Sequence, residues 1–260
     1  MIASGRAFQF AILLVLGAAM FVYMYRAKRG HIPYIRKIAV IDRINEAIGR
    51  ATEMGRPVHF GTGVGSQLSG VNAPMTLAGV SVLCYVAGLC AQYATGFIST
   101  FNVPELIPFV QDVVEETYNA RGRPGAYNQN EMVRYLSDVL MSYALAATGI
   151  VTREKVAANF YIGAIMGEAP IILEEAHNAG AITIAGTARW GTMPMVAVLS
   201  DYCIIMEEIY AAAAYVSKDP QTISTLAAED VGKYLSIVLV LLGVVLTSFG
   251  VEIIQQMISR

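Results

Sequence analysis

Two long apolar stretches lie near the ends of the chain. Phe8–Tyr25 and Leu235–Val251 carry no charged side chain, and each approaches the length that a helix needs to cross about 30 Å of hydrocarbon. Arg26, Lys28 and Arg29 follow the first stretch directly, as is typical of a membrane–water boundary. A cleaved signal peptide is the alternative for the first stretch, and a buried core helix for the second. No small-residue cleavage site follows the first, and the second is terminal and rich in Val and Leu, so both patterns favour membrane-spanning helices.

Basic residues are distributed unequally around these two stretches. Only Arg6 precedes the first and only Arg260 follows the second, whereas a basic cluster lies just after the first. That cluster comprises Arg26, Lys28, Arg29, Arg36, Lys37 and Arg43. Because cytoplasmic flanks are enriched in Lys and Arg, we expect an integral protein of the cell (inner) membrane whose central part is cytoplasmic and whose termini both lie outside. The expected parts are an anchor with its basic flank (1–30), a cytoplasmic domain (31–232) and a second anchor (233–260).

The central part alternates short apolar runs with longer helical patterns, which is the rhythm of a parallel sheet. The predicted strands are Pro57–Phe60, Phe97–Phe101, Met132–Leu136, Asn159–Ile162, Ala181–Ala185 and Tyr202–Met206. The predicted fold class is therefore α/β: a Rossmann-like, open and mainly parallel sheet flanked by helices, with one N-terminal and one C-terminal transmembrane helix.

Helices are predicted between these strands. Arg36–Met54 places isoleucines on one face and should end at Gly55, while Pro104–Asn119 is amphipathic and has Asn102 as its expected N-cap. Ala73–Tyr93 is uncharged, and a third membrane span is the alternative. Its early proline, its two interior glycines and the strand that follows favour a helix buried by the sheet on one side and by another element, or another subunit, on the other. Arg121–Asn130 is predicted to be a loop.

Composition narrows the classes of function. The chain is 55% hydrophobic and 15% charged with a mean hydropathy of +0.52, which excludes a disordered protein. A formal charge of −2 gives no general attraction for phosphates, so we expect no nucleic-acid partner. The surplus of apolar residues outside the two end stretches predicts contacts between copies, that is, a homo-oligomer. Cys84, Cys90 and Cys203 have no metal-like spacing and are predicted to be small buried hydrophobes in a reducing compartment.

Candidate chemistry lies in the segments that follow the strands, since parallel sheets bind ligands there. The segment Gly61-Thr62-Gly63-Val64-Gly65-Ser66 offers backbone N–H groups that could surround an anion. Its spacing matches neither the dinucleotide fingerprint nor a P-loop, and a plain turn is the alternative. Gly186-Thr187-Ala188 is either a second wall of the same crevice or a tight turn.

Glu168 is the only charged residue in Ile162–Leu173. A buried carboxylate must be protonated or have a partner, and Arg189 is one candidate partner across the crevice. Glu168 is thus either a structural residue, in an ion pair or at an exposed helix start, or a functional acid or ligand-binding group. The candidate ligand-binding residues are Gly61, Thr62, Gly63, Gly65, Ser66, Asn102, Glu168, Gly186 and Thr187. We predict no metal site and no cofactor, and no catalytic residue is identifiable, because the histidines have no ligand spacing and no serine elbow is present.

Four sequence strings resemble an uncharacterised family of prokaryotic, membrane-anchored α/β proteins, known as a domain of unknown function. They are DRINEAIGRATEMGRPV (42–58), REKVAANFYIG (153–163), ITIAGTA (182–188) and DYCIIMEEIYAAAAYVS (201–217). The resemblance covers about residues 35 to 250 and implies no activity.

We therefore expect a membrane-anchored α/β protein that self-assembles into a homo-oligomeric structural or organising complex at the cytoplasmic face of the membrane. Its partners are the lipid bilayer and copies of itself; the sequence identifies no other protein partner and favours a non-enzyme. The alternative is an enzyme or sensor that binds a small anionic ligand or nucleotide in the crevice at the carboxyl ends of the strands.

Overall fold

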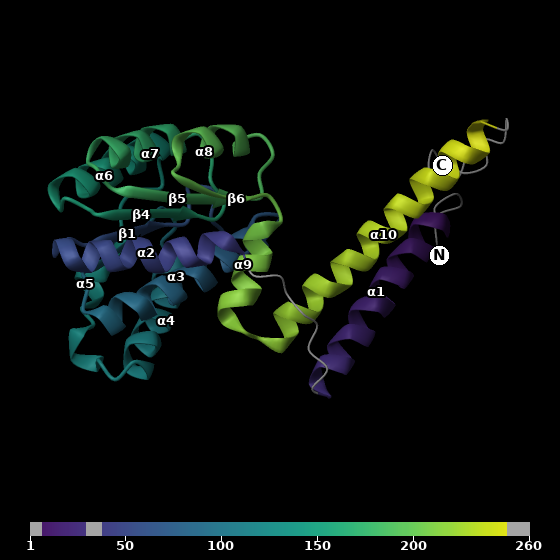
Figure 1. The fold of residues 1–260 in the computed structure, drawn as a ribbon, viewed down its shortest axis with the longest axis horizontal. Coiled ribbons are helices and arrows are strands. Elements are labelled where there is room, and N and C mark those ends of the chain that lie inside the picture. Colours follow the sequence, from purple (N-terminus) through teal and green to yellow (C-terminus); the bar gives the residue numbers. More distant parts are fainter. Residues whose placement is uncertain (1–6, 30–37, 249–260) are drawn as a thin grey trace. The chain divides into compact units, whose positions relative to one another are not determined.

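The computed structural model describes residues 7–29 and 38–248, which belong to two compact units (Figure 1). Residues 36–217 form one unit, and residues 1–35 together with 218–260 form the other. The predicted boundary between residues 232 and 233 falls inside a continuous helix, since that helix already begins at Pro220.

The larger unit contains a six-stranded parallel sheet in the order β3-β2-β1-β4-β5-β6. This is the strand order of doubly wound folds that bind dinucleotides. Each strand lies within about two residues of its predicted limits. The strands are β1 (Val58–Gly61), β2 (Phe97–Phe101), β3 (Val133–Tyr135), β4 (Ala158–Ile162), β5 (Ile182–Thr187) and β6 (Tyr202–Ile205).

Helices cover both faces of the sheet (Figure 1). One layer contains α6 (Leu140–Arg153), α7 (Ala169–Asn178) and α8 (Met193–Leu199). The other contains α2 (Ala39–Met54), α3 (Ala73–Tyr93), α4 (Leu106–Ala120) and α9 (Glu208–Ser217). The predicted loop at 121–130 includes the short helix η1 (Pro124–Ala126) and the start of α5 (Gln129–Met132).

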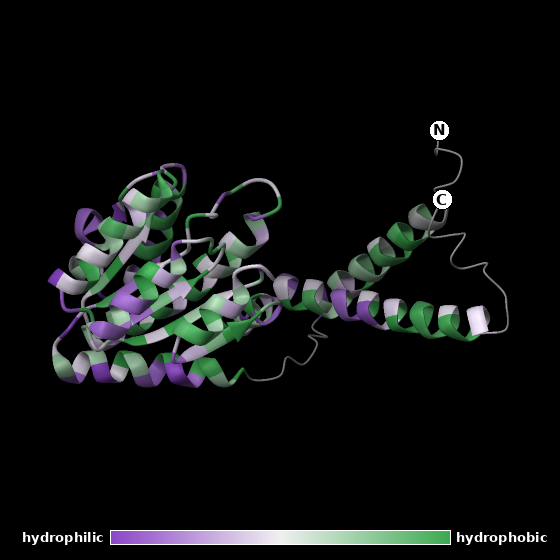
Figure 2. Cartoon of the chain, turned by 90° about the horizontal axis from the view of Figure 1, so that it is seen from above, coloured by the Kyte–Doolittle hydropathy of each residue, from purple (hydrophilic) through white to green (hydrophobic). Residues whose placement is uncertain are grey.

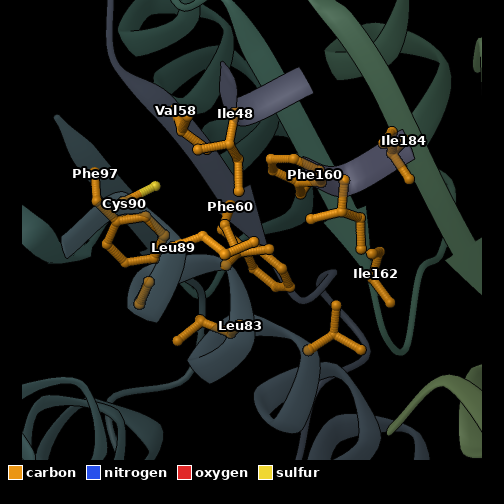
Figure 3. Close-up of a cluster of buried hydrophobic side chains, with 14 of the residues drawn as sticks. Ile48, Val58, Phe60, Leu83, Leu89, Cys90, Phe97, Phe160, Ile162 and Ile184 are labelled. Atoms are coloured by element: carbon orange, nitrogen blue, oxygen red, sulfur yellow. The ribbon is translucent and has the colours of Figure 1, made fainter. Parts of the chain in front are cut away.

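Successive residues of a strand point to opposite faces of the sheet and so contribute to two different hydrophobic cores. Phe160 and Ile162 of β4 join the core under α2 and α3, whereas Tyr161 between them joins the core under α6 and α7. Figure 3 shows the first of these cores, in which Phe60 and Phe160 stack with ring centroids 6.3 Å apart. Because both faces are covered, the four central strands β1, β2, β4 and β5 are buried along nearly their whole length and do not alternate with exposed residues.

Helix α2 follows the predicted pattern. Ile41, Ile44 and Ile48 are buried, and the helix ends at Gly55, whose φ of 64° favours glycine. Helix α3 is apolar enough to cross a membrane by length and composition, but 67% of it is buried within the larger unit. As predicted, α3 is a core helix, and α2, α4 and α9 of the same chain pack against it.

The smaller unit contains α1 (Ala7–Lys28) and α10 (Pro220–Ser248), which lie side by side (Figure 1). Figure 2 shows hydrophobic residues along α1 and along the second half of α10. The Asp219 carboxylate caps α10 by accepting hydrogen bonds from the backbone N–H and the hydroxyl of Thr222 (2.9 and 2.7 Å). In α1, Phe10–Lys28 has the length and composition of a span, with 6% buried. The predicted second span, Leu235–Val251, falls only in part within the described residues.

Candidate functional site

The predicted crevice lies between β1 and β4, where the strand order reverses. The chain passes from β1 to β2 on one side, and β4 pairs with β1 on the other. In folds of this order, ligands bind between the segments that follow these two strands. The structure therefore brings together the Gly61–Ser66 segment, which follows β1, and the segment containing Glu168, which follows β4.

Close packing closes this crevice. The Gly65 N–H donates to the Ala164 carbonyl oxygen at 2.8 Å. A Cβ atom at Gly63 or at Gly65 would lie 2.6 Å from that same oxygen, a separation that real Cβ atoms essentially never show. Gly63 also has a φ of 87°, which favours glycine. The glycines thus allow two backbones to touch, and this packing explains the pattern without a bound anion.

The Glu168 carboxylate occupies the polar centre of the crevice and is fully buried. Its Oε1 accepts hydrogen bonds from the Val64 N–H at 2.8 Å and from the Tyr161 hydroxyl at 2.9 Å, and its Oε2 accepts one from the Met166 N–H at 3.1 Å. Glu168 also directly precedes α7, whose N-terminus favours a negative charge. The chain's own carboxylate therefore sits where the sequence predicted an external anion.

Glu168 is a buried helix start rather than an exposed one, and its candidate partner Arg189 does not pair with it. The Arg189 guanidinium donates to the Asn72 Oδ1 at 3.3 Å, and the described residues show no ion pair between Arg189 and Glu168. Backbone N–H groups and a phenol satisfy the carboxylate instead. Sequence spacing cannot reveal such donors, because every residue except proline carries a backbone N–H.

Two polar atoms of the crevice segments lack hydrogen-bond partners in the part of the chain that the structure describes. Asn102 donates from Nδ2 to the Val64 carbonyl oxygen at 2.7 Å, but its Oδ1 has no partner among the described residues. The Thr62 hydroxyl is likewise buried without one, whereas the Ser66 hydroxyl donates to the Thr62 carbonyl at 2.8 Å. The prediction that Asn102 caps α4 is wrong, since Glu105 holds that position.

Gly186 and Thr187 lie within β5 rather than in a loop after it. The Gly186 carbonyl accepts the Gly163 N–H at 3.0 Å, and a Cβ at Gly186 would lie 2.6 Å from the Ile204 Cβ. Thr187 is buried and accepts the Arg189 N–H at 3.3 Å. These two residues extend the sheet under the crevice, so their small size serves strand packing.

A buried polar chain crosses the middle of the sheet next to the crevice. His59 Nδ1 lies 2.6 Å from the Asn159 Oδ1, and His59 Nε2 lies 2.9 Å from the Thr100 hydroxyl, which is 3.0 Å from the Tyr143 hydroxyl. Since an amide oxygen only accepts, Nδ1 carries the ring proton and the Thr100 hydroxyl donates to Nε2. Sequence analysis missed this buried polar network. Polar residues inside three fully buried strands were its only signal.

Burial keeps these groups neutral. Desolvation lowers the pKa of His59 to about 4, with the nearby Arg134 charge acting in the same direction and the Asn159 hydrogen bond opposing it. Desolvation likewise raises the pKa of Tyr143 and raises that of Tyr161 well above its usual range. At neutral pH the His59 ring and the phenols of Tyr143 and Tyr161 are therefore uncharged.

Cys84, Cys90 and His177 lie outside the crevice. Burial raises the pKa of Cys84 to about 12 and also raises that of Cys90, so neither thiol is activated. His177 lines a surface hollow of about 270 Å³ with Arg50 and Asp201 at the opposite, amino-terminal edge of the strands. Within the described residues, no group of three or more His, Cys, Asp or Glu is placed to hold a metal ion.

Comparison with protein families matches residues 1–258 to a family described as a domain of unknown function, DUF6754. The match extends beyond the region in which the sequence strings resemble such a family. Comparison with curated proteins and with solved structures finds no match.

Proposed function

Because the chain belongs to the DUF6754 family, a domain of unknown function, we propose its role from its own geometry. The protein is a membrane-anchored α/β protein that self-assembles into a homo-oligomeric structural or organising complex. It acts at the cytoplasmic face of the membrane, and both termini lie outside.

The observation that carries self-assembly is the outward face of α6. Met141 and Leu145 are 58% and 66% exposed and lie four residues apart on one face of the helix. The whole helix is uncharged until Arg153 at its end. A solvent-facing helix normally presents charged residues on its outer side, so this face is suited to contact with another apolar surface.

The closed crevice supports a structural role over a catalytic one. Glu168 fills the position in which doubly wound folds hold a ligand, and it is satisfied by three donors from the chain. An entering anion would have to displace this carboxylate and leave it buried without partners, which is costly.

Anchoring is supported by the outer surface of α1 and α10. Leu13, Phe21 and Val244 are 65%, 69% and 62% exposed, and these side chains need an apolar environment. Arg26 and Lys28 lie in the last turn of α1, which favours a cytoplasmic position for that end. Anchoring predicts that the full chain stays in vesicles during alkaline carbonate extraction. Release into the supernatant would contradict it.

Self-assembly is tested by chemical cross-linking of the full chain in intact membranes. We expect species larger than the monomer, and we expect Leu145→Arg to shift them towards monomer because it places a charge in the contact. Val198→Arg is the matched control, since Val198 of α8 is exposed (83%) and lies outside the α6 face. Monomer alone in the unsubstituted protein, or equal ladders in both variants, would refute the proposal.

One observation favours the alternative, a small anionic ligand or nucleotide at the crevice. The buried Thr62 hydroxyl and the Asn102 Oδ1 lack partners among the described residues, and such atoms cost stability unless a ligand or water satisfies them. This alternative predicts that a nucleotide or organic acid raises the melting temperature. At a concentration of a hundred times its Kd, such a ligand would add about 2.7 kcal/mol to the free energy of unfolding. Gly63→Ala should abolish the effect. If no ligand shifts melting, the alternative fails.

A further inference from the structure

Three exposed apolar side chains lie in the segments that follow the carboxyl ends of β1 and β5. Leu68 and Val71 lie in the segment after β1 and are 39% and 92% exposed, and Trp190 follows β5 and is 83% exposed. We call these three residues the Trp190 patch. A tryptophan left in water at this level is unusual, because its ring is among the largest apolar groups in a protein.

Hydrogen bonds hold the two segments together, so this exposure belongs to the fold. The Arg189 guanidinium donates to the Asn72 Oδ1 at 3.3 Å, and Trp190 and Val71 are the chain neighbours of these two residues. The Asn72 Nδ2 in turn donates to the Gly65 carbonyl at 3.0 Å. The segments that carry Trp190 and Val71 are therefore joined to each other and to the segment after β1 by side-chain hydrogen bonds.

The chemistry of the patch matches a phospholipid headgroup layer. Residues 67–72 (QLSGVN) and 188–192 (ARWGT) contain one charged side chain, Arg189, and no acid. Tryptophan concentrates at membrane–water boundaries because its ring is apolar and its N–H is polar, and an arginine guanidinium binds phosphate. Insertion of Trp190 with Val71, beside an Arg189–phosphate contact, would satisfy each group.

The small area of the patch suits contact between lipid and a tethered domain. One tryptophan, one valine and one leucine present roughly a few hundred Å² in total, less than the about 800 Å² that an untethered protein partner takes from each side of a stable interface. A tethered domain needs far less, because its anchors keep it near the bilayer at a high effective concentration. Only Lys218 and Asp219 separate the end of α9 from the start of α10.

We propose that the Trp190 patch docks on the phospholipid headgroup layer of the membrane that holds the anchors. The inference rests on the proposed anchoring and adds a contact surface of the larger unit. Docking restricts the domain to one edge-on orientation towards the lipid, so neighbouring copies present their α6 faces in the same plane.

Trp190 is the only tryptophan in the chain, so intrinsic fluorescence tests this directly. The full-length protein is reconstituted in phosphatidylcholine vesicles with and without lipids brominated near the top of the acyl chains, which quench tryptophan on contact. The matched control carries Trp190→Phe and Met54→Trp. Met54 is 47% exposed at the end of α2, just before β1, and so lies at the opposite edge of the sheet.

We expect brominated lipid to reduce Trp190 emission at least twofold and to leave the tryptophan at position 54 unchanged. Two results would overturn the proposal. In the first, aqueous acrylamide quenches Trp190 and brominated lipid does not. In the second, the emission is blue-shifted but brominated lipid does not quench it, which would indicate contact with another copy. Carbonate extraction of the same vesicles separates the two proposals. Retention with a water-exposed Trp190 refutes docking alone, whereas release refutes anchoring as well.

Discussion

His59 makes the stability of the larger unit depend on pH. Its ring is fully buried, with one nitrogen beside the Asn159 amide oxygen and the other beside the Thr100 hydroxyl. The perturbation is a change from pH 7 to pH 5, which protonates an ordinary histidine. In the fold, a second ring proton would place a positive charge in the centre of the sheet without a counter-charge.

The size of the effect follows from the pKa. The ordinary pKa of histidine is 6.5, and burial lowers that of His59 to about 4. The unfolded chain therefore binds more protons between these values, so stability is full above pH 6.5 and falls as the pH drops towards 4. Between pH 7 and pH 5, this linkage removes about 2 kcal/mol from the free energy of unfolding.

Urea unfolding of the full chain in detergent, followed by circular dichroism at both pH values, measures this difference. His59→Gln cannot titrate, so its free energy of unfolding should lose about 2 kcal/mol less than that of the unsubstituted protein when the pH falls. His177→Gln is the matched control, because His177 is an exposed histidine of the same unit. Equal losses in the unsubstituted protein and in His59→Gln would refute the reasoning.

Three further predictions follow from the crevice and from the start of α10. Glu168→Ala leaves three buried donors without an acceptor and should lower the free energy of unfolding by about 3 kcal/mol or more, whereas Glu168→Gln, which keeps one acceptor oxygen, should lower it less. Gly63→Ala should lower the free energy of unfolding, measured in urea, by about 2 to 4 kcal/mol. The control Gly70→Ala should lower it by about 1 kcal/mol, because Gly70 also has a positive φ but has open space around it. Equal losses would argue against the close backbone packing at Gly63. Asp219→Ala should speed amide hydrogen exchange in the first turn of α10, with a cost of about 1 kcal/mol. Hydrogen bonds from Thr222 lower the pKa of Asp219 in the folded protein, so the charged cap is fully present above the ordinary pKa of aspartate and is lost as the pH falls through the lowered pKa. Amide hydrogen exchange that changes neither with the substitution nor with the pH would rule out this cap.

Strands and core helices could be predicted because their signals are local. The isoleucines of α2 recur at helical spacing and are buried as expected, and Phe97–Phe101 is a continuous apolar run that forms β2 within its predicted limits. The burial of α3 could also be predicted, since glycine and proline interrupt its apolar run. Local patterns therefore suffice for the elements and for the class of fold.

The position of the candidate site could be predicted from the sequence, but the contacts within it could not. Glu168 was identified from its isolation among apolar residues, and the crevice from the positions of the strands. Its true donors are the Val64 and Met166 N–H groups and the Tyr161 hydroxyl, which only the folded backbone brings together. The sequence around Gly63 and Gly65 predicts a plain turn or an anion-binding segment. In the structure, the Ala164 carbonyl oxygen packs against both glycines and leaves no room for a side chain. Contacts between segments a hundred residues apart leave no trace in spacing.

The two outer strands of the sheet, β3 and β6, are only three and four residues long. A short rim offers few unpaired amide and carbonyl groups, so one molecule has little to which it could add a strand from the next. In the proposed planar assembly, contacts between copies would therefore rely on side chains rather than on the addition of a strand from one molecule to the sheet of the next.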